Sequence, residues 1–183
     1  MGNQDSRLSS TEELGKKLFV AARDADTKTV RKIIDFGLSL RTPYEQERIL
    51  NWDYSDGWRP LHRAAFGGYK DVIKLLLRAG ALGHITTVDG WTSSHWAVAQ
   101  RRTGVVKLLV NAGMDLKVRT NGHKTALDLA VHKSPSVVIA RMILNAGYVL
   151  DMNISNSIPA KVATYLYNLR PFECTDSDTI FVC

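Results

Sequence analysis

Residues 56–65 read DGWRPLHRAA, and the chain repeats this pattern 33 residues later, where residues 89–98 read DGWTSSHWAV. The same offset links residues 72–80, VIKLLLRAG, to residues 105–113, VVKLLVNAG. A match this long at one fixed spacing indicates an internal repeat in which each period forms one supersecondary unit. The chain is therefore expected to fold as a row of similar units, each packed on its neighbours.

Each period has the marks of a turn followed by two helices. Asp-Gly favours a tight turn, and Leu-His-x-Ala-Ala predicts a short helix whose small alanines let a neighbouring helix approach closely. The later Leu-rich stretch has apolar residues at helical spacing, and Gly80 and Gly113 stand where that helix must end in a left-handed C-cap. One such helix pair cannot bury its apolar face alone, so neighbouring pairs must stack.

This pattern resembles the ankyrin repeat, whose signature includes Asp-Gly-x-Thr-Pro-Leu-His-x-Ala-Ala and a later Leu-Leu-Leu-x-x-Gly-Ala. Residues 56–88 carry it most fully, whereas the next unit has Ser93 and Ser94 in place of Pro-Leu. The resemblance implies an all-α ankyrin-repeat solenoid of stacked helix pairs, with β-hairpin or turn fingers and a C-terminal capping helix. It divides residues 12–150 into repeats at 13–55, 56–88, 89–121 and 122–150.

The segments outside the repeats complete the expected domain plan. Residues 1–11 are expected to form a flexible N-terminal segment, residues 151–170 a C-terminal capping helix, and residues 171–183 an acidic tail. The fourth repeat contains one extra residue in its helix–helix loop near 134–136.

An insertion follows the first repeat. Gly37 and Asp56 are 19 residues apart, whereas the equivalent Gly80 and Asp89 are 9 apart, which places the extra residues near 39–49. Insertions in solenoids map to loops on one face, often the binding face. The alternative is a surface loop without function, since lengthening a loop costs little free energy.

Composition indicates a globular chain without an evident catalytic site. Of the 183 residues, 45% are hydrophobic and 23% are charged, which are ordinary values for one soluble unit. The sequence has no nucleophile elbow, no phosphate loop and no His-Glu-x-x-His zinc motif. We therefore expect a protein that is not an enzyme and uses no cofactor or metal. Cys174 and Cys183 cannot frame a disulfide scaffold, which favours a cytoplasmic location.

The positive charge is concentrated in the middle of the sequence. The formal net charge is +6, and residues 56–133 hold 12 Lys and Arg against 5 Asp and Glu. A basic surface suits an acidic protein partner, an anionic membrane or nucleic acid. The alternative is a lysine-rich surface that is simply solvated.

Aromatic and basic residues occupy positions that the ankyrin resemblance places on the exposed, concave side. Trp58 and Trp91 both follow Asp-Gly, so stacking is expected to set the two indoles in register, one repeat apart. The predicted partner-binding residues are Tyr54, Trp58, Arg63, Trp91, Trp96, Arg101, Arg102 and Lys124. Trp, Tyr and Arg dominate binding hot spots. In the alternative, the tryptophans pack on neighbouring hairpins.

Two histidines have a structural interpretation. His62 and His95 fall on the same repeat position. The ankyrin resemblance implies that a histidine here ties neighbouring turns together by hydrogen bonds. We therefore expect neither to be a metal ligand or a general base.

The N-terminus carries a separate signal. Residues 1–6, MGNQDS, fit the N-myristoylation pattern, with Gly2 exposed once Met1 is removed. A single myristoyl chain gives only marginal membrane binding, about 10⁴ M⁻¹. The expectation is therefore a lipoprotein with reversible, peripheral membrane attachment.

These observations favour a monomeric, non-enzymatic scaffold or adaptor that binds an acidic or amphipathic protein partner on its concave face. One alternative is a substrate receptor of a ubiquitin ligase, since residues 158–166, IPAKVATYL, are faintly similar to the end of a suppressor-of-cytokine-signalling box. Another is nucleic-acid binding through the basic centre, although no recognised nucleic-acid motif is present. Residues 180–183, IFVC, loosely resemble one class of PDZ ligand.

Overall fold

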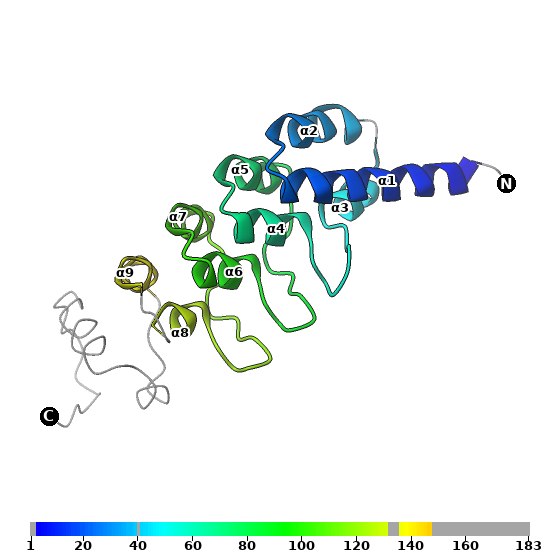
Figure 1. The fold of residues 1–183 in the computed structure, drawn as a ribbon. Coiled ribbons are helices and arrows are strands. Elements are labelled where there is room, and N and C mark those ends of the chain that lie inside the picture. Colours follow the sequence, from blue (N-terminus) through cyan, green and yellow to red (C-terminus); the bar gives the residue numbers. More distant parts are fainter. Residues whose placement is uncertain (1–2, 40, 132–135, 148–183) are drawn as a thin grey trace, which may run out of the picture.

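A computed structural model describes residues 3–39, 41–131 and 136–147, in which helices alternate between two rows (Figure 1). The inner row holds α1 (Asn3–Arg23), α4 (Pro60–Gly67), α6 (Ser93–Ala99) and α8 (Ala126–Val131). The outer row holds α2 (Thr27–Lys32) with its π-helical extension η1 (Ile33–Gly37), α5 (Lys70–Arg78), α7 (Thr103–Asn111) and α9 (Val137–Asn145). Each helix packs on its partner in the pair and on the next helix of its row. The predicted solenoid of stacked helix pairs is confirmed.

Three fingers connect successive helix pairs and project from the same side of the stack (Figure 1). They span residues 51–59, 79–92 and 112–125 and are called the first, second and third finger. Backbone hydrogen bonds join neighbouring fingers: Val88 N donates to Asp56 O at 3.0 Å, and Asn121 N donates to Asp89 O at 3.0 Å. No β-strand occurs within the described residues, so the fingers there are turns.

The Asp-Gly pairs allow the fingers to stack this closely. Gly57 and Gly90 both have a φ of 76°, in the left-handed region. A Cβ on Gly57 would lie 2.8 Å from Thr87 Cα, and a Cβ on Gly90 would lie 2.9 Å from Asn121 N. Glycine is therefore required at these turns for its conformation and for the approach of the next finger.

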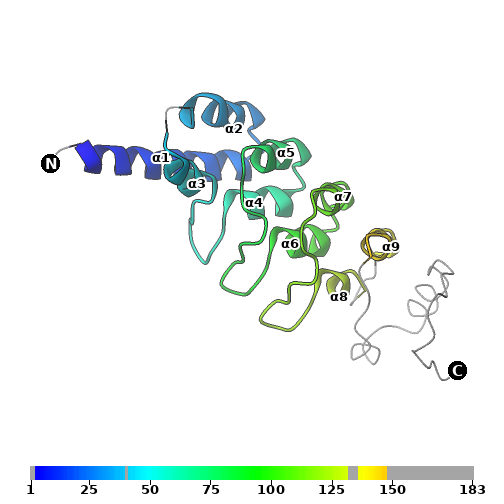
Figure 2. The ribbon, with the colours of Figure 1, turned by 180° about the vertical axis from the view of Figure 1, so that it is seen from behind.

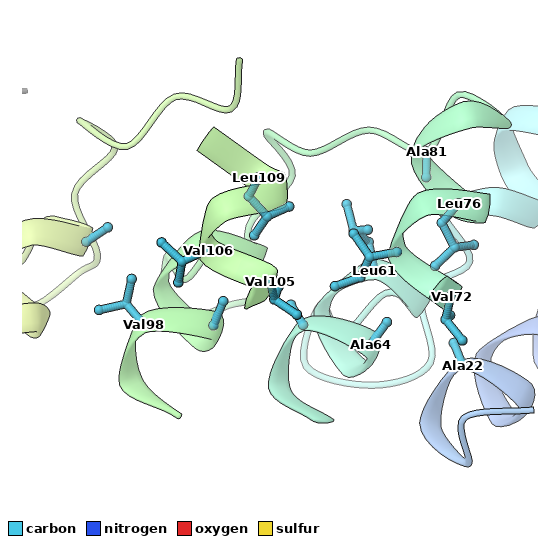
Figure 3. Packing of buried hydrophobic residues seen from close by; sticks show 14 of the residues in the cluster. Ala22, Leu61, Ala64, Val72, Leu76, Ala81, Val98, Val105, Val106 and Leu109 are labelled. Atoms are coloured by element: carbon cyan, nitrogen blue, oxygen red, sulfur yellow. The ribbon is translucent and has the colours of Figure 1, made fainter. Parts of the chain in front are cut away.

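A single apolar cluster runs through the stack from α1 to α9 (Figure 3). The buried triad of α5, formed by Val72, Ile73 and Leu76, returns in α7 after 33 residues and in α9 after 34. Val131 of α8 still keeps the 33-residue offset from Val98 of α6. The extra residue of the fourth repeat therefore lies between α8 and α9, as expected.

The insertion near 39–49 is a helix rather than the predicted loop. It forms α3 (Pro43–Leu50), which packs against α1. Thr42 N donates to Glu45 Oε2 at 3.0 Å, and Glu45 N donates to Thr42 Oγ1 at 3.3 Å, which completes a capping box. Ile49 is fully buried at the far end. The inserted residues thus extend the hydrophobic core of the first repeat.

The N-terminal segment also differs from the expectation. Helix α1 begins at Asn3, inside the segment expected to be flexible, and extends beyond the other helices (Figure 2). No helix in the described part of the chain is long and apolar enough to cross a membrane. The predicted capping helix at 151–170 and acidic tail at 171–183 lie outside the described residues, with the motifs at 158–166 and 180–183.

Candidate functional site

Four aromatic side chains meet where the first two fingers adjoin the inner helices. Trp58 and Trp91 belong to the first and second fingers, and Phe66 and Trp96 to α4 and α6. We call these four residues the aromatic cluster. The Trp96 ring lies between the other indoles, with its centroid 4.5 Å from that of Trp58 and 4.4 Å from that of Trp91. Phe66 closes the cluster edge-on, 5.7 Å from Trp96.

The tryptophans do not stack as two indoles one repeat apart. Trp96, from the inner helix, is inserted between Trp58 and Trp91, and both contacts are tilted, by 33° and 35°. All three rings are half-buried. Aromatic pairs contribute about 0.5–1.5 kcal/mol beyond their buried area. The fold thus holds a partly exposed aromatic surface in place before any partner arrives.

Arg63 covers one side of the aromatic cluster. Its Cζ atom lies 5.2 Å from the ring centroid of Trp58 and 5.6 Å from that of Phe66. These distances are within the range for cation–π attraction. Arg23 lowers the pKa of the Asp24 carboxyl through a hydrogen bond, and the charge of Arg63 adds a smaller lowering effect. Arg63 therefore places a positive charge at the rim of the aromatic surface.

A buried histidine supports the first finger beneath Trp58. His62 Nδ1 accepts a hydrogen bond from Arg59 N at 3.2 Å, so Nε2 carries the hydrogen and donates to Ile85 O at 3.0 Å. Trp58 contacts this ring edge-on at 6.3 Å. Burial lowers the pKa of His62 to about 4, against an opposing effect of the Ile85 carbonyl. His62 is therefore neutral near pH 7, and its hydrogen bond links the first two fingers.

His95 has the equivalent place in the next repeat. Its Nδ1 accepts a hydrogen bond from Thr92 N at 3.1 Å, and its ring lies 6.1 Å from that of Trp91. Burial lowers the pKa of His95, while the backbone of Lys124 acts in the opposite direction. In the fourth repeat, Asp128 takes this position and caps α8. These contacts support the structural role expected for both histidines.

Other predicted site residues lie around the aromatic cluster rather than in it. Tyr54 is 57% exposed and stacks on Phe19 of α1, with ring centroids 4.5 Å apart. Arg102 Nε donates to the Phe66 carbonyl at 3.1 Å, so it borders the cluster at the C-terminal end of α4. Arg101 is exposed in the α6–α7 turn, with a left-handed φ of 56°. Tyr54 and the two arginines therefore mark two separate edges of the surface.

Lys124 extends the same surface into the fourth repeat. It occupies on the third finger the repeat position that Trp58 and Trp91 occupy on the other two. Its side chain is half-buried, and its carbonyl accepts a hydrogen bond from Thr120 N at 3.0 Å. The row of equivalent positions thus changes from two indoles to an ammonium group.

Phe66 is the member of the aromatic cluster that the sequence interpretation missed. It lies three residues after Arg63, and such residues are neighbours on one face of a helix. This spacing was the available signal, because the face that carries Arg63 had already been assigned to the partner side. The ring contacts with Trp58 and Trp96 bring Phe66 into the candidate site.

The comparison with protein families agrees with this architecture. The chain matches the family models described as ankyrin repeats (many copies), over residues 18–77, and ankyrin repeat, over residues 89–121. The two matches together span about half of the chain and include all four residues of the aromatic cluster. No individual curated protein matches the chain. The chain belongs to the ankyrin-repeat family, whose repeats generally mediate protein–protein interaction.

Proposed function

We propose that this ankyrin-repeat chain is a monomeric, non-enzymatic adaptor or scaffold that binds an acidic or amphipathic segment of a partner protein on its concave face. The observation that carries the proposal is Trp96 held between Trp58 and Trp91, with Arg63 over the rim. Partly exposed tryptophans supported by buried neighbours are the kind of residue that dominates binding hot spots.

The aromatic cluster fits a partner segment with one apolar side chain and nearby negative charge. Its rings already pack on one another, so a bound segment would order few further side chains, which lowers the entropic cost of binding. Arg63 stands on the α4 side and Lys124 on the third finger. A carboxylate of the partner can pair with either cation, while an aromatic or aliphatic side chain contacts the indoles.

Selection from a displayed library of random peptides tests this proposal directly. We expect the full chain to enrich peptides that combine aromatic and acidic residues, and Trp91→Ala to lose most of that binding. Tyr44→Ala is the matched control, because Tyr44 is an exposed aromatic residue on α3, outside the aromatic cluster. Arg63→Glu is expected to remove the preference for acidic peptides while keeping the aromatic one. Equal binding by the Trp91→Ala and Tyr44→Ala variants would sink the proposal.

We further propose that Gly2 is myristoylated and that the protein is cytoplasmic, with reversible attachment to membranes. The support is the sequence pattern at residues 1–6, because Gly2 lies outside the described residues. Metabolic labelling with a clickable myristate analogue should label the wild-type chain and leave Gly2→Ala unlabelled. Equal labelling of both chains, or of neither, contradicts acylation at Gly2.

A further inference from the structure

A second surface lies on the outer row, on the side of the stack away from the fingers (Figures 1 and 2). Helices α2 and α5 pack side by side there. Both expose their basic residues to solvent, and these are Lys28, Arg31, Lys32, Lys70, Lys74 and Arg78. Asp35 and Asp71 are the acidic residues of α2, η1 and α5. We call the six cations together with Phe36 the outer basic surface.

Phe36 gives this surface an apolar element. It lies in η1 at the end of α2 and is 74% exposed, the highest value among the large exposed hydrophobic residues of the described chain. Beside it is a surface hollow of about 430 Å³, whose lining includes Lys28, Arg31 and Lys32. A Cβ on Gly37 would lie 3.7 Å from the Leu14 side chain, so this end of η1 adjoins α1.

We propose that the outer basic surface docks on an anionic lipid bilayer, with Phe36 entering the boundary between headgroups and acyl chains. Six cations face two carboxylates on these elements, which complements a negatively charged leaflet. A basic face with an exposed aromatic residue is the pattern that binds in the plane of the bilayer interface.

The aromatic content of the outer row favours lipid over nucleic acid. Phe36 is the one aromatic side chain in the described outer-row helices. Proteins that bind single-stranded nucleic acid without sequence preference use several rings on which successive bases stack. A lone exposed phenylalanine among cations suits insertion into a bilayer instead.

This docking site goes beyond the proposed partner function and does not depend on acylation of Gly2. It would supply the second membrane contact that one myristoyl chain needs for stable attachment. The aromatic cluster lies on the first two fingers and the inner helices, whereas the outer basic surface lies on the outer row. A bilayer on the outer row therefore leaves the concave face open to a protein partner.

Vesicle sedimentation with the full, non-acylated chain tests the proposal. We expect binding to vesicles of phosphatidylcholine with roughly one part in four of phosphatidylserine, and much weaker binding to phosphatidylcholine alone. Arg31→Glu with Lys74→Glu should weaken binding about 30-fold or more, since each cation near the leaflet contributes about fivefold. Lys117→Glu with Arg119→Glu makes the same charge change on the third finger and should stay close to wild type.

Phe36→Ser separates insertion from simple charge attraction. This variant keeps the net charge and should weaken vesicle binding about tenfold, because it removes the apolar contact. It also keeps the test decisive if the double variant does not fold, which circular dichroism would reveal.

Three results would overturn the proposal. The first is no preference of the wild-type chain for phosphatidylserine, and the second is equal weakening by the two double variants. The third is tighter binding to DNA or RNA than to the vesicles at the same salt concentration, with the same dependence on Arg31 and Lys74. Peptide binding by the aromatic cluster is tested through Trp91, so either proposal can fail without the other.

Discussion

Replacing His62 with asparagine should remove much of the loss of stability that acid causes in this protein. The folded state buries the His62 ring, which lowers its pKa from the ordinary 6.5 to about 4. The unfolded chain has the ordinary pKa and therefore binds a proton that the folded chain does not. Stability from this group is complete above pH 6.5 and is lost as the pH falls from 6.5 toward 4.

The size of the effect follows from the two pKa values. A change of this extent corresponds to about 3 kcal/mol when the titration is complete. Between pH 7 and pH 5 the unfolded His62 gains most of its proton while the folded His62 stays largely neutral, which costs about 2 kcal/mol. Asparagine carries no titratable proton, so the variant lacks this contribution at every pH.

Urea unfolding followed by circular dichroism at pH 7 and pH 5 measures the effect. His62→Asn is expected to be less stable than wild type at pH 7, because it loses the hydrogen bond to the Ile85 carbonyl. The decisive quantity is the further loss on moving to pH 5, which should be about 2 kcal/mol larger for wild type. Other titrating groups are common to both proteins and cancel. Equal losses would refute the inference that burial keeps His62 neutral.

Three further substitutions test the backbone account. Ser93→Pro should raise stability by about 1 kcal/mol in thermal unfolding, because Ser93 is the first residue of α6 and follows an extended Thr92 with ψ 170°. Ala25→Gly should raise the unfolding midpoint in urea, by about 0.5–1 kcal/mol, because Ala25 has a left-handed φ of 60°. Gly57→Ala should lower stability by about 2 kcal/mol or more in the same assay, because its methyl group would meet Thr87 Cα.

Controls and contrary outcomes differ for the three. Gly80 also has a left-handed φ, of 94°, but a Cβ there has no neighbour within 4 Å. Gly80→Ala should therefore cost clearly less than Gly57→Ala, and equal costs would show that finger contact is not the cause. A Ser93→Pro protein that melts earlier than wild type would mean that the first N–H of α6 is needed. An unchanged midpoint for Ala25→Gly would mean that its turn is not strained.

Most of the fold could be predicted because the repeat fixes the phase of every helix pair. The positions of the α5 triad recur as buried residues in α7 and, after the extra residue, in α9. The exception is α3, because spacing alone reveals the length of an insertion and not its conformation. Thr42-Pro-x-Glu45 is a helix-start signature that contained the missing information.

The candidate site was predictable in membership but not in arrangement. Repeat phase identified Trp58 and Trp91, but it could not show that Trp96 reaches both of them, since side-chain packing between repeats is not periodic. The outer basic surface was also hidden in the sequence. Its α2 cations lie within residues 1–55, where 9 Lys and Arg are balanced by 9 Asp and Glu along the chain. Folding sorts these charges by face.

The central claim is that a protein partner occupies the aromatic cluster. Oxidative footprinting of the full chain, free and saturated with a selected acidic–aromatic peptide, tests it most directly. The account predicts protection of the indoles of Trp58 and Trp91 in the complex, with unchanged oxidation of Tyr44 on α3. Unchanged oxidation of both indoles in a saturated complex would contradict the claim and place the binding surface elsewhere.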